Sequence, residues 1–344
     1  MTQSSETMDG PATTPQDTRR AQRLSSTSVA VIAIYGLVVA MILLSRAVSP
    51  AFGGLSQVET IFYLAAFLVF CAFGQGLVIL VRGLDLSIAS LITLGGVLST
   101  ALMAGSNDGL FYILPAILLA CALIGVVSGI GVTFFAIPPF IMTMAVGIIV
   151  YSLCLGFTQG TPRGFPSPLL RDLMQARLLA IPAPIWLLLA FVAVGTVLQG
   201  YSAFGRKLNA VGNNPEAAYV AGLSARTLTI SAYAVSAACA GLTGILLAAY
   251  ANGATLRMGD DYLLPSIAAV VVGGSSILGG RGSFLGTVGG ALLLTTLATI
   301  LSALGIGQGW KTILEGLVIL VALIVLREQV FDALQAGLRG LKKG

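Results

Sequence analysis

Residues 111–133 read FYILPAILLACALIGVVSGIGVT, an apolar stretch without a single charged side chain. A helix needs about 20 apolar residues to cross a hydrocarbon core of roughly 30 Å, so this stretch is long enough to cross a membrane. The whole chain of 344 residues continues the pattern, because 57% of its residues are hydrophobic and only 9% are charged. Soluble domains carry about 25% charged residues. The sequence therefore predicts an all-α integral membrane protein.

The same length rule divides the chain into about ten apolar segments with short connections. These predicted transmembrane helices are 29–48, 60–80, 86–104, 111–133, 139–158, 183–200, 229–250, 263–278, 284–304 and 310–326. Residues 1–28 are polar and predict a disordered cytoplasmic tail. Residues 29–326 then form the transmembrane domain, and residues 327–344 form a second cytoplasmic tail.

The orientation is predicted from the distribution of Lys and Arg. With both termini in the cytoplasm, twelve of the 18 cations face inside and six face outside. Cytoplasmic loops carry the excess of positive charge in membrane proteins. The sequence therefore predicts that both termini are cytoplasmic.

The source of energy is predicted from what the sequence lacks. It contains no GxxxxGK[ST] phosphate-binding loop, so we expect no ATP hydrolysis by this chain. Histidine is absent, and the charges cluster near the ends of the predicted helices, which disfavours a proton relay. The four cysteines lie in apolar runs without CxxC spacing and are expected to be buried, with no metal site. A machine driven by a partner protein is favoured over a gradient-driven transporter, and a membrane enzyme is the least favoured alternative.

The long inner loop, residues 201–228, carries the clearest local signals. Asn214-Pro215-Glu216 predicts a helix start, with Pro at the first helical position and an acid in the first turn. Gly222 predicts its end after about two turns. A short helix that projects into the cytoplasm suits docking to a partner, while an ordinary surface loop explains the same residues about equally well.

Two further features are ambiguous from the residues alone. Asp85 suits either a helix cap beside Ser87 or a polar contact at a broken helix beside a conduction path. The tripeptide at 87–89 recurs at 266–268, and the two copies enter their segments from opposite sides. An inverted-topology repeat requires that arrangement, although coincidence explains so few matches equally well.

Four motifs in this order resemble the ribose-type sugar permeases of bacterial ABC importers. The segment 83–87 (GLDLS) resembles the family's G-I-D-L-S motif, and 138–143 (PPFIMT) resembles its P-P-F-I-x-T motif. Residues 205–222 resemble the cytoplasmic coupling loop. Residues 268–274 (AAVVVGG) and 279–283 (GGRGS) resemble a two-part glycine signature. The resemblance covers residues 60–326.

The resemblance implies a large-permease (type II-like) ABC importer fold in the bacterial inner membrane, with two permeases, identical or paralogous, around one pathway. It also implies a cytoplasmic ABC ATPase that binds ATP and Mg, and a periplasmic sugar-binding protein. This chain itself would hold no cofactor, and no nucleic-acid partner is expected. The ATPase would contact Gly212, Asn213, Glu216, Ala217, Ala218 and Gly222, and the candidate pathway or helix-break residues are Asp85, Ser87, Pro138, Pro139, Thr143, Gly273 and Gly274.

The remaining predictions concern the outer face and the cargo. Outer arginines could complement an acidic binding protein; they are Arg163, Arg171, Arg177 and Arg257. The implied cargo is a monosaccharide, and relatives that carry nucleosides, an autoinducer sugar or amino acids remain alternatives. No residue is expected to be catalytic.

Overall fold

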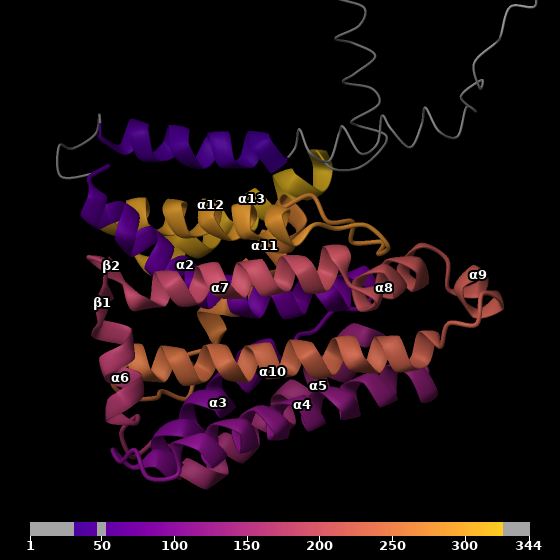
Figure 1. Ribbon diagram of the computed structural model, residues 1–344, viewed down its shortest axis with the longest axis horizontal. Coiled ribbons are helices and arrows are strands. Elements are labelled where there is room, and N and C mark those ends of the chain that lie inside the picture. Colours follow the sequence, from indigo (N-terminus) through magenta and orange to yellow (C-terminus); the bar gives the residue numbers. More distant parts are fainter. Residues whose placement is uncertain (1–30, 47–52, 326–344) are drawn as a thin grey trace, which may run out of the picture.

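The computed structural model describes residues 31–46 and 53–325, which form a helical bundle (Figure 1). Its elements, in chain order, are a first helix Val31–Arg46, α2 Leu55–Leu80, α3 Ile88–Met103, α4 Leu110–Phe134, α5 Pro139–Thr158, α6 Pro168–Gln175, β1 Arg177–Leu178, β2 Ile181–Pro182, α7 Ala183–Thr196, the π-helical turn η1 Val197–Tyr201, α8 Ala203–Asn213, α9 Pro215–Val220, α10 Ala225–Ala251, α11 Asp260–Val272, α12 Phe284–Ala303 and α13 Gln308–Val325.

Six of the described helices are long and apolar enough to cross a membrane, which confirms the all-α membrane class. They are α2, α4, α5, α7 with η1, α10 and α12. The first helix and α3 are apolar but shorter. Each of the ten predicted segments overlaps a helix, while the number of crossings stays a prediction. The predicted tails, 1–28 and 327–344, lie outside the described residues.

The interior of the bundle is built around α2, α10 and α12, whose residues are mostly buried. By contrast, only about a quarter of the residues in the apolar windows of α4, α5 and α7 are buried. Glycines allow the close approach of α4 to α10: a Cβ atom at Gly125 would collide with the Tyr233 carbonyl, and one at Gly129 with the Ile230 backbone. This is the ordinary use of a GxxxG pair in membrane helices.

Two short helices, α3 and α11, begin about halfway along the length of the bundle and not at either of its ends. Gly259, directly before α11, lies against the backbone of Ala89 in the first turn of α3. Ala89 is separated by about 20 Å of helix from the last residue of α3, at 1.5 Å per residue. The first turns of both helices therefore lie near the middle of the bundle.

The predicted segments 86–104 and 263–278 need correction at these two helices. The helix α3 starts at Ile88 because residues 83–87 are not helical. The helix α11 runs from Asp260 to Val272 and not to 278, since Gly274 has a φ of +85° that favours glycine and ends the helix. Residues 273–283 form a loop instead.

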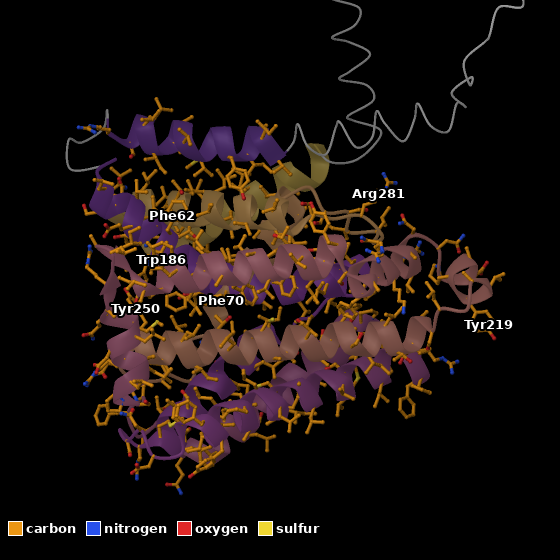
Figure 2. All side chains as sticks on the ribbon, in the orientation of Figure 1. Phe62, Phe70, Trp186, Tyr219, Tyr250 and Arg281 are labelled. Atoms are coloured by element: carbon orange, nitrogen blue, oxygen red, sulfur yellow. The ribbon has the colours of Figure 1, made fainter. Side chains whose placement is uncertain are left out.

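The bundle has two different ends (Figure 1). One end carries α6 and the small antiparallel pair β1–β2, where Arg177 pairs with Pro182. Trp186 and Tyr250 lie toward this end, as in the aromatic belts of membrane interfaces (Figure 2). The other end carries α8 and α9, with α9 projecting beyond the bundle. These are called the α6 end and the α9 end below.

Candidate functional site

Residues 201–228, predicted as an inner loop, contain two helices, α8 and α9, because polar side chains cap their first turns. Ser202 accepts a hydrogen bond from the Gly205 N–H at the start of α8 (3.2 Å). The Asn214 side chain accepts hydrogen bonds from the N–H groups of Glu216 (3.1 Å) and Ala217 (3.0 Å) at the start of α9. Such caps contribute about 1 kcal/mol each. The predicted helix start at Asn214-Pro215-Glu216 is confirmed.

The helix α9 has the predicted length of about two turns and exposes a mixed surface. It spans six residues, and Gly222, with a φ of +78°, follows it where the sequence placed its end. Of the predicted coupling residues, Glu216, Ala217 and Gly222 are exposed, whereas Ala218 is buried. Tyr219 and Val220 are 77% and 87% exposed, and Figure 2 shows Tyr219 on the projecting part of the molecule. Neither was singled out from the sequence, although a large apolar side chain beside Glu216 was a visible signal.

The C-terminal end of α8 is joined to the end of α2 by Arg82. The Arg82 guanidinium donates from Nε to the Gly212 carbonyl (2.7 Å) and from Nη2 to the Asn213 carbonyl (2.8 Å). The last carbonyls of a helix have no partner inside the helix, and a cation there also suits the helix dipole. Arg82 was missed as a site residue because its partners lie about 130 positions away in the sequence.

The loop before α12 completes the same junction. The Asn213 amide donates to the Gly280 carbonyl (2.9 Å), and the Gly280 N–H donates to the Leu80 carbonyl (2.8 Å). A Cβ atom at Gly212 would collide with the Leu80 carbonyl. We call this set of contacts, formed by Leu80, Arg82, Gly212, Asn213 and Gly280, the three-segment junction. Through it, the base of the α8–α9 pair touches two separate parts of the bundle.

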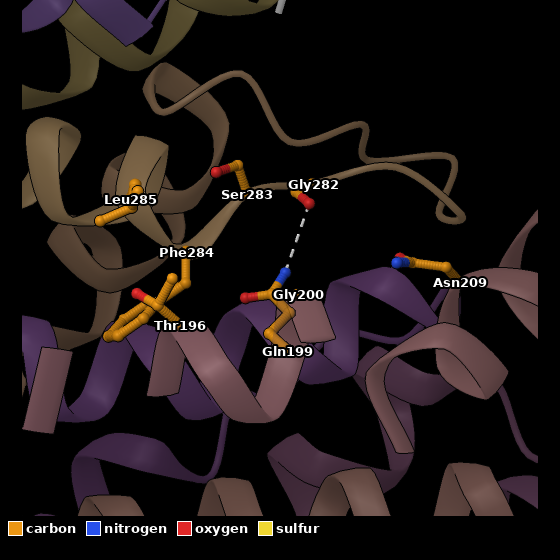
Figure 3. Close-up of a pocket in the computed structure, with 8 residues that line it drawn as sticks. All are labelled: Thr196, Gln199, Gly200, Asn209, Gly282, Ser283, Phe284 and Leu285. Carbon is orange, nitrogen blue, oxygen red and sulfur yellow. Dashed lines mark hydrogen bonds between the residues drawn. The ribbon is translucent and has the colours of Figure 1, made fainter. Parts of the chain in front are cut away.

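A cavity of about 110 Å³ lies beside this junction (Figure 3). Its lining residues come from α7, η1, α8 and the start of α12; they are Thr196, Gln199, Gly200, Asn209, Gly282, Ser283, Phe284 and Leu285. The Gln199 amide donates weakly to the Gly282 carbonyl (3.4 Å). Thr196 Oγ1 and Asn209 Oδ1 are buried and have no hydrogen-bond partner in the protein. Water molecules commonly satisfy such groups, and the cavity has room for several.

The structure brings together two of the motifs that the sequence placed far apart. Asp85 is 1% exposed, and its Oδ1 accepts hydrogen bonds from the N–H (3.0 Å) and the hydroxyl (2.5 Å) of Ser87. Its Oδ2 accepts from the Ser236 hydroxyl on α10 (2.9 Å). Thr143 of α5 accepts from the Leu86 N–H (2.9 Å). Asp85 therefore orders the segment before α3, as a cap does, and also fastens it to α10.

The other candidate pathway residues are divided between two places. Pro138 and Pro139 start α5, and the Pro139 carbonyl accepts a hydrogen bond from Thr143 (3.0 Å). Gly273 and Gly274 end α11 instead, where Gly273 lies against Gly286 of α12. The structure thus groups Pro138, Pro139 and Thr143 with Asp85 and Ser87, and it places the two glycines with α12.

The four candidate arginines of the outer face do not form one patch. Arg171 lies 3.7 Å from Asp172, and Arg177 pairs with Glu59 at 2.7 Å; both pairs are at the α6 end. Arg163 is exposed in the loop before α6. Arg257 pairs with Asp260 at 2.6 Å, next to the start of α11 inside the bundle. The fourth arginine therefore belongs to a different part of the molecule from the other three.

Comparison with known proteins gives a consistent result. Residues 57–323 match the family described as branched-chain amino acid transport system / permease component. The ribose import permease protein of Haemophilus influenzae is 31% identical over 83% of this chain and 90% of that protein.

Two further relatives cover a similar length. The ribose import permease protein of Escherichia coli K12 is also 31% identical over 83% of this chain and 90% of its own length. The autoinducer 2 import system permease protein of Escherichia coli K12 DH10B is 32% identical over 83% of each chain. No solved structure matches the chain.

Proposed function

This chain belongs to the family of branched-chain amino acid transport system permease components, and on that premise we propose that it is the membrane-spanning subunit of an ATP-driven importer of a monosaccharide. The observation that carries the proposal is the similarity to two ribose import permeases, which extends over 90% of their lengths. A likeness over so much of the chain covers the conducting bundle and the α8–α9 pair together. The chain is thus a transport subunit, and a separate ATPase supplies ATP hydrolysis.

The cargo is a sugar in this proposal, with the autoinducer 2 signal as the second candidate. The similarity to an autoinducer 2 import permease at 32% identity favours that second candidate. Because a separate periplasmic binding protein selects the cargo, the ligand bound by that protein separates the two.

The α8–α9 pair is the proposed docking surface for the ATPase. It projects from one end of the bundle, exposes Tyr219 and Val220 beside Glu216, and is joined at its base to α2 and to the loop before α12. Exposed aromatic side chains with a polar surround are typical of protein interfaces. Movement of this pair by the ATPase would be transmitted to the bundle through the three-segment junction and would change the side on which the pathway opens.

This docking role gives a direct test on the reconstituted importer. Replacing Glu216 by Arg reverses a charge on the proposed interface, and we expect the ATPase activity stimulated by loaded binding protein to fall about tenfold, as for a loss of 1.4 kcal/mol. Glu216→Asp, which keeps the negative charge at the same position, is the matched control and should leave stimulation unchanged. Full stimulation of the Glu216 variant would refute the docking role.

The transport class is tested with the chain in proteoliposomes. Sugar uptake should require the ATPase, the binding protein and ATP together. Uptake by the chain alone, driven by an ion gradient, would instead identify a secondary transporter.

The arrangement in the membrane follows from the same proposal. The α9 end and both termini face the cytoplasm, about ten segments cross the membrane in a type II-like fold, and a second copy or a paralogue completes the pathway. Helices α2–α5 and α10–α13 repeat the same order of one long, one short and two long helices. Because α2 ends and α10 begins at the α9 end, the two halves run in opposite directions, which supports an inverted repeat.

A further inference from the structure

The ion pair between Arg257 and Asp260 lies at an unusual depth for an exposed charge. It flanks Gly259, which contacts Ala89 in the first turn of α3. The neighbouring Met258 lies against Gly96, halfway along α3. On the other side, Leu256 packs against a cluster formed by Val146, Val150 and Cys154, which extends from the middle of α5 toward its C-terminal end. Contacts with two different helices thus place the pair near the middle of the bundle.

The two side chains are nevertheless open to their surroundings. The Arg257 side chain is 79% exposed and the Asp260 side chain is 45% exposed, and Asp261, the next residue of α11, is exposed as well. A charged side chain facing lipid at mid-depth costs about 2.5–3.5 kcal/mol on insertion scales. Charges at this depth therefore face a water-filled space or a bundle interior. By contrast, the exposed side chains at the corresponding depth of α4 are apolar, such as Leu119 and Leu123, and suit contact with lipid.

We propose that Arg257, Asp260 and Asp261 line the aqueous conduction path and contact the cargo as it passes. This inference rests on the proposed importer function, and it goes beyond that function by naming the cargo-contacting residues. Arg257 is thereby moved from the proposed docking surface for the binding protein into the pathway.

The chemistry of the three side chains indicates a neutral, polyhydroxylated cargo. Carboxylate oxygens accept hydrogen bonds from hydroxyl groups, and the guanidinium fork donates several. One cation and two acids leave a net negative charge, which disfavours an anionic cargo. The position at the N-terminus of α11, adjacent to that of α3, resembles the broken-helix sites that other transporters build at mid-membrane.

The proposal is tested first by water accessibility. In the assembled importer, Arg257→Cys and Asp260→Cys should react with a charged, membrane-impermeant methanethiosulfonate about tenfold faster than Leu123→Cys, a similarly exposed position halfway along α4 that the proposal assigns to the lipid. The native cysteines Cys71, Cys121, Cys154 and Cys239 are all buried, so the unmodified chain gives the background rate. Equal, slow reaction at all three positions would overturn the proposal.

The second test separates a cargo contact from a purely structural ion pair. Asp260→Asn should lower ATP-dependent ribose uptake about tenfold, the effect of losing one hydrogen bond to a charged group, with ATPase stimulation retained. The exchanged double variant, Arg257→Asp with Asp260→Arg, restores the pair but not its geometry toward the cargo, so it should remain impaired. Recovery of uptake by the exchange would assign the pair a structural role and overturn the proposal.

The two proposals fail in different ways. If the unmodified complex takes up no sugar with ATP, the importer function fails whatever the labelling shows. If the unmodified complex takes up sugar but the introduced cysteines at 257 and 260 stay unreactive, only the assignment of these residues to the pathway fails.

Discussion

Asp85 and Asp260 are two acidic residues at the starts of the two short helices, α3 and α11, and their surroundings differ completely. Asp85 is buried, and its carboxylate accepts hydrogen bonds from the N–H and hydroxyl groups of Ser87 and from the hydroxyl group of Ser236. Asp260 is open, and its partner is the still more exposed Arg257. A buried carboxylate must be satisfied by the protein, whereas an open one can be shared with water or a passing solute. The difference fits two separate roles: Asp85 stabilises the bundle, whereas Asp260 is open to water or, as proposed above, to the cargo.

The largest effect on stability is expected at the buried acid, Asp85, and it tests whether the two acids differ. Asp85→Ala leaves the Ser236 hydroxyl and the Ser87 N–H without their acceptor, so we expect the free energy of unfolding to fall by about 3 kcal/mol. Thermal unfolding of the purified chain measures this. Asp260→Ala removes an exposed partner and should leave the melting temperature unchanged. Similar shifts in melting temperature for the two variants would show that the two acids contribute equally to stability and do not differ as described.

A smaller effect is expected where the two short helices meet. Gly259→Ala places a methyl group against the Ala89 carbonyl, and relief of that clash requires one helix start to move, at a cost of about 2 kcal/mol. Gly253→Ala, in the same loop, meets nothing within 4 Å and serves as the control. If both variants unfold at the unmodified temperature, α3 and α11 do not meet as described.

The smallest effect is a gain in stability, and it is expected at the buried residue Gln75. Gln75 of α2 is fully buried, and neither its amide nitrogen nor its amide oxygen has a partner in the protein. Gln75→Leu removes these unsatisfied groups and should raise stability by about 1 kcal/mol. Gln57→Leu on the same helix should lower it, because the Gln57 amide accepts a hydrogen bond from the Gly53 N–H. A destabilised Gln75 variant would indicate that a water or solute molecule is hydrogen-bonded to the Gln75 amide.

The sequence predicted what depends on local patterns. The apolar segments, the start of α9 at Asn214-Pro215-Glu216 and its end near Gly222 each follow from residues close together in the chain. It also predicted burial of all four cysteines. Hydrophobic length alone, however, could not show that α3 and α11 start about halfway along the bundle, because the length of an apolar segment does not give the depth at which it begins.

What the sequence could not predict depends on contacts between distant segments. Arg82 and Gly212 meet across 130 positions, and Asp85 and Ser236 across 151. Arg257 was placed on the outer face because it follows a predicted membrane segment. Only the contacts of Leu256, Met258 and Gly259 with α5 and α3 show that this loop returns into the bundle.

The three-segment junction has a consequence for how one input can produce a concerted response. Backbone carbonyls accept all four of its hydrogen bonds, the Arg82 and Asn213 side chains donate three of them, and glycines at 212 and 280 let the backbones touch. Because the junction joins the base of the α8–α9 pair both to the end of α2 and to the loop before α12, a displacement of α9 under the proposed coupling would reach both segments together. Movement of one segment alone would break these hydrogen bonds, so a partial opening, through which solutes could leak, would be disfavoured.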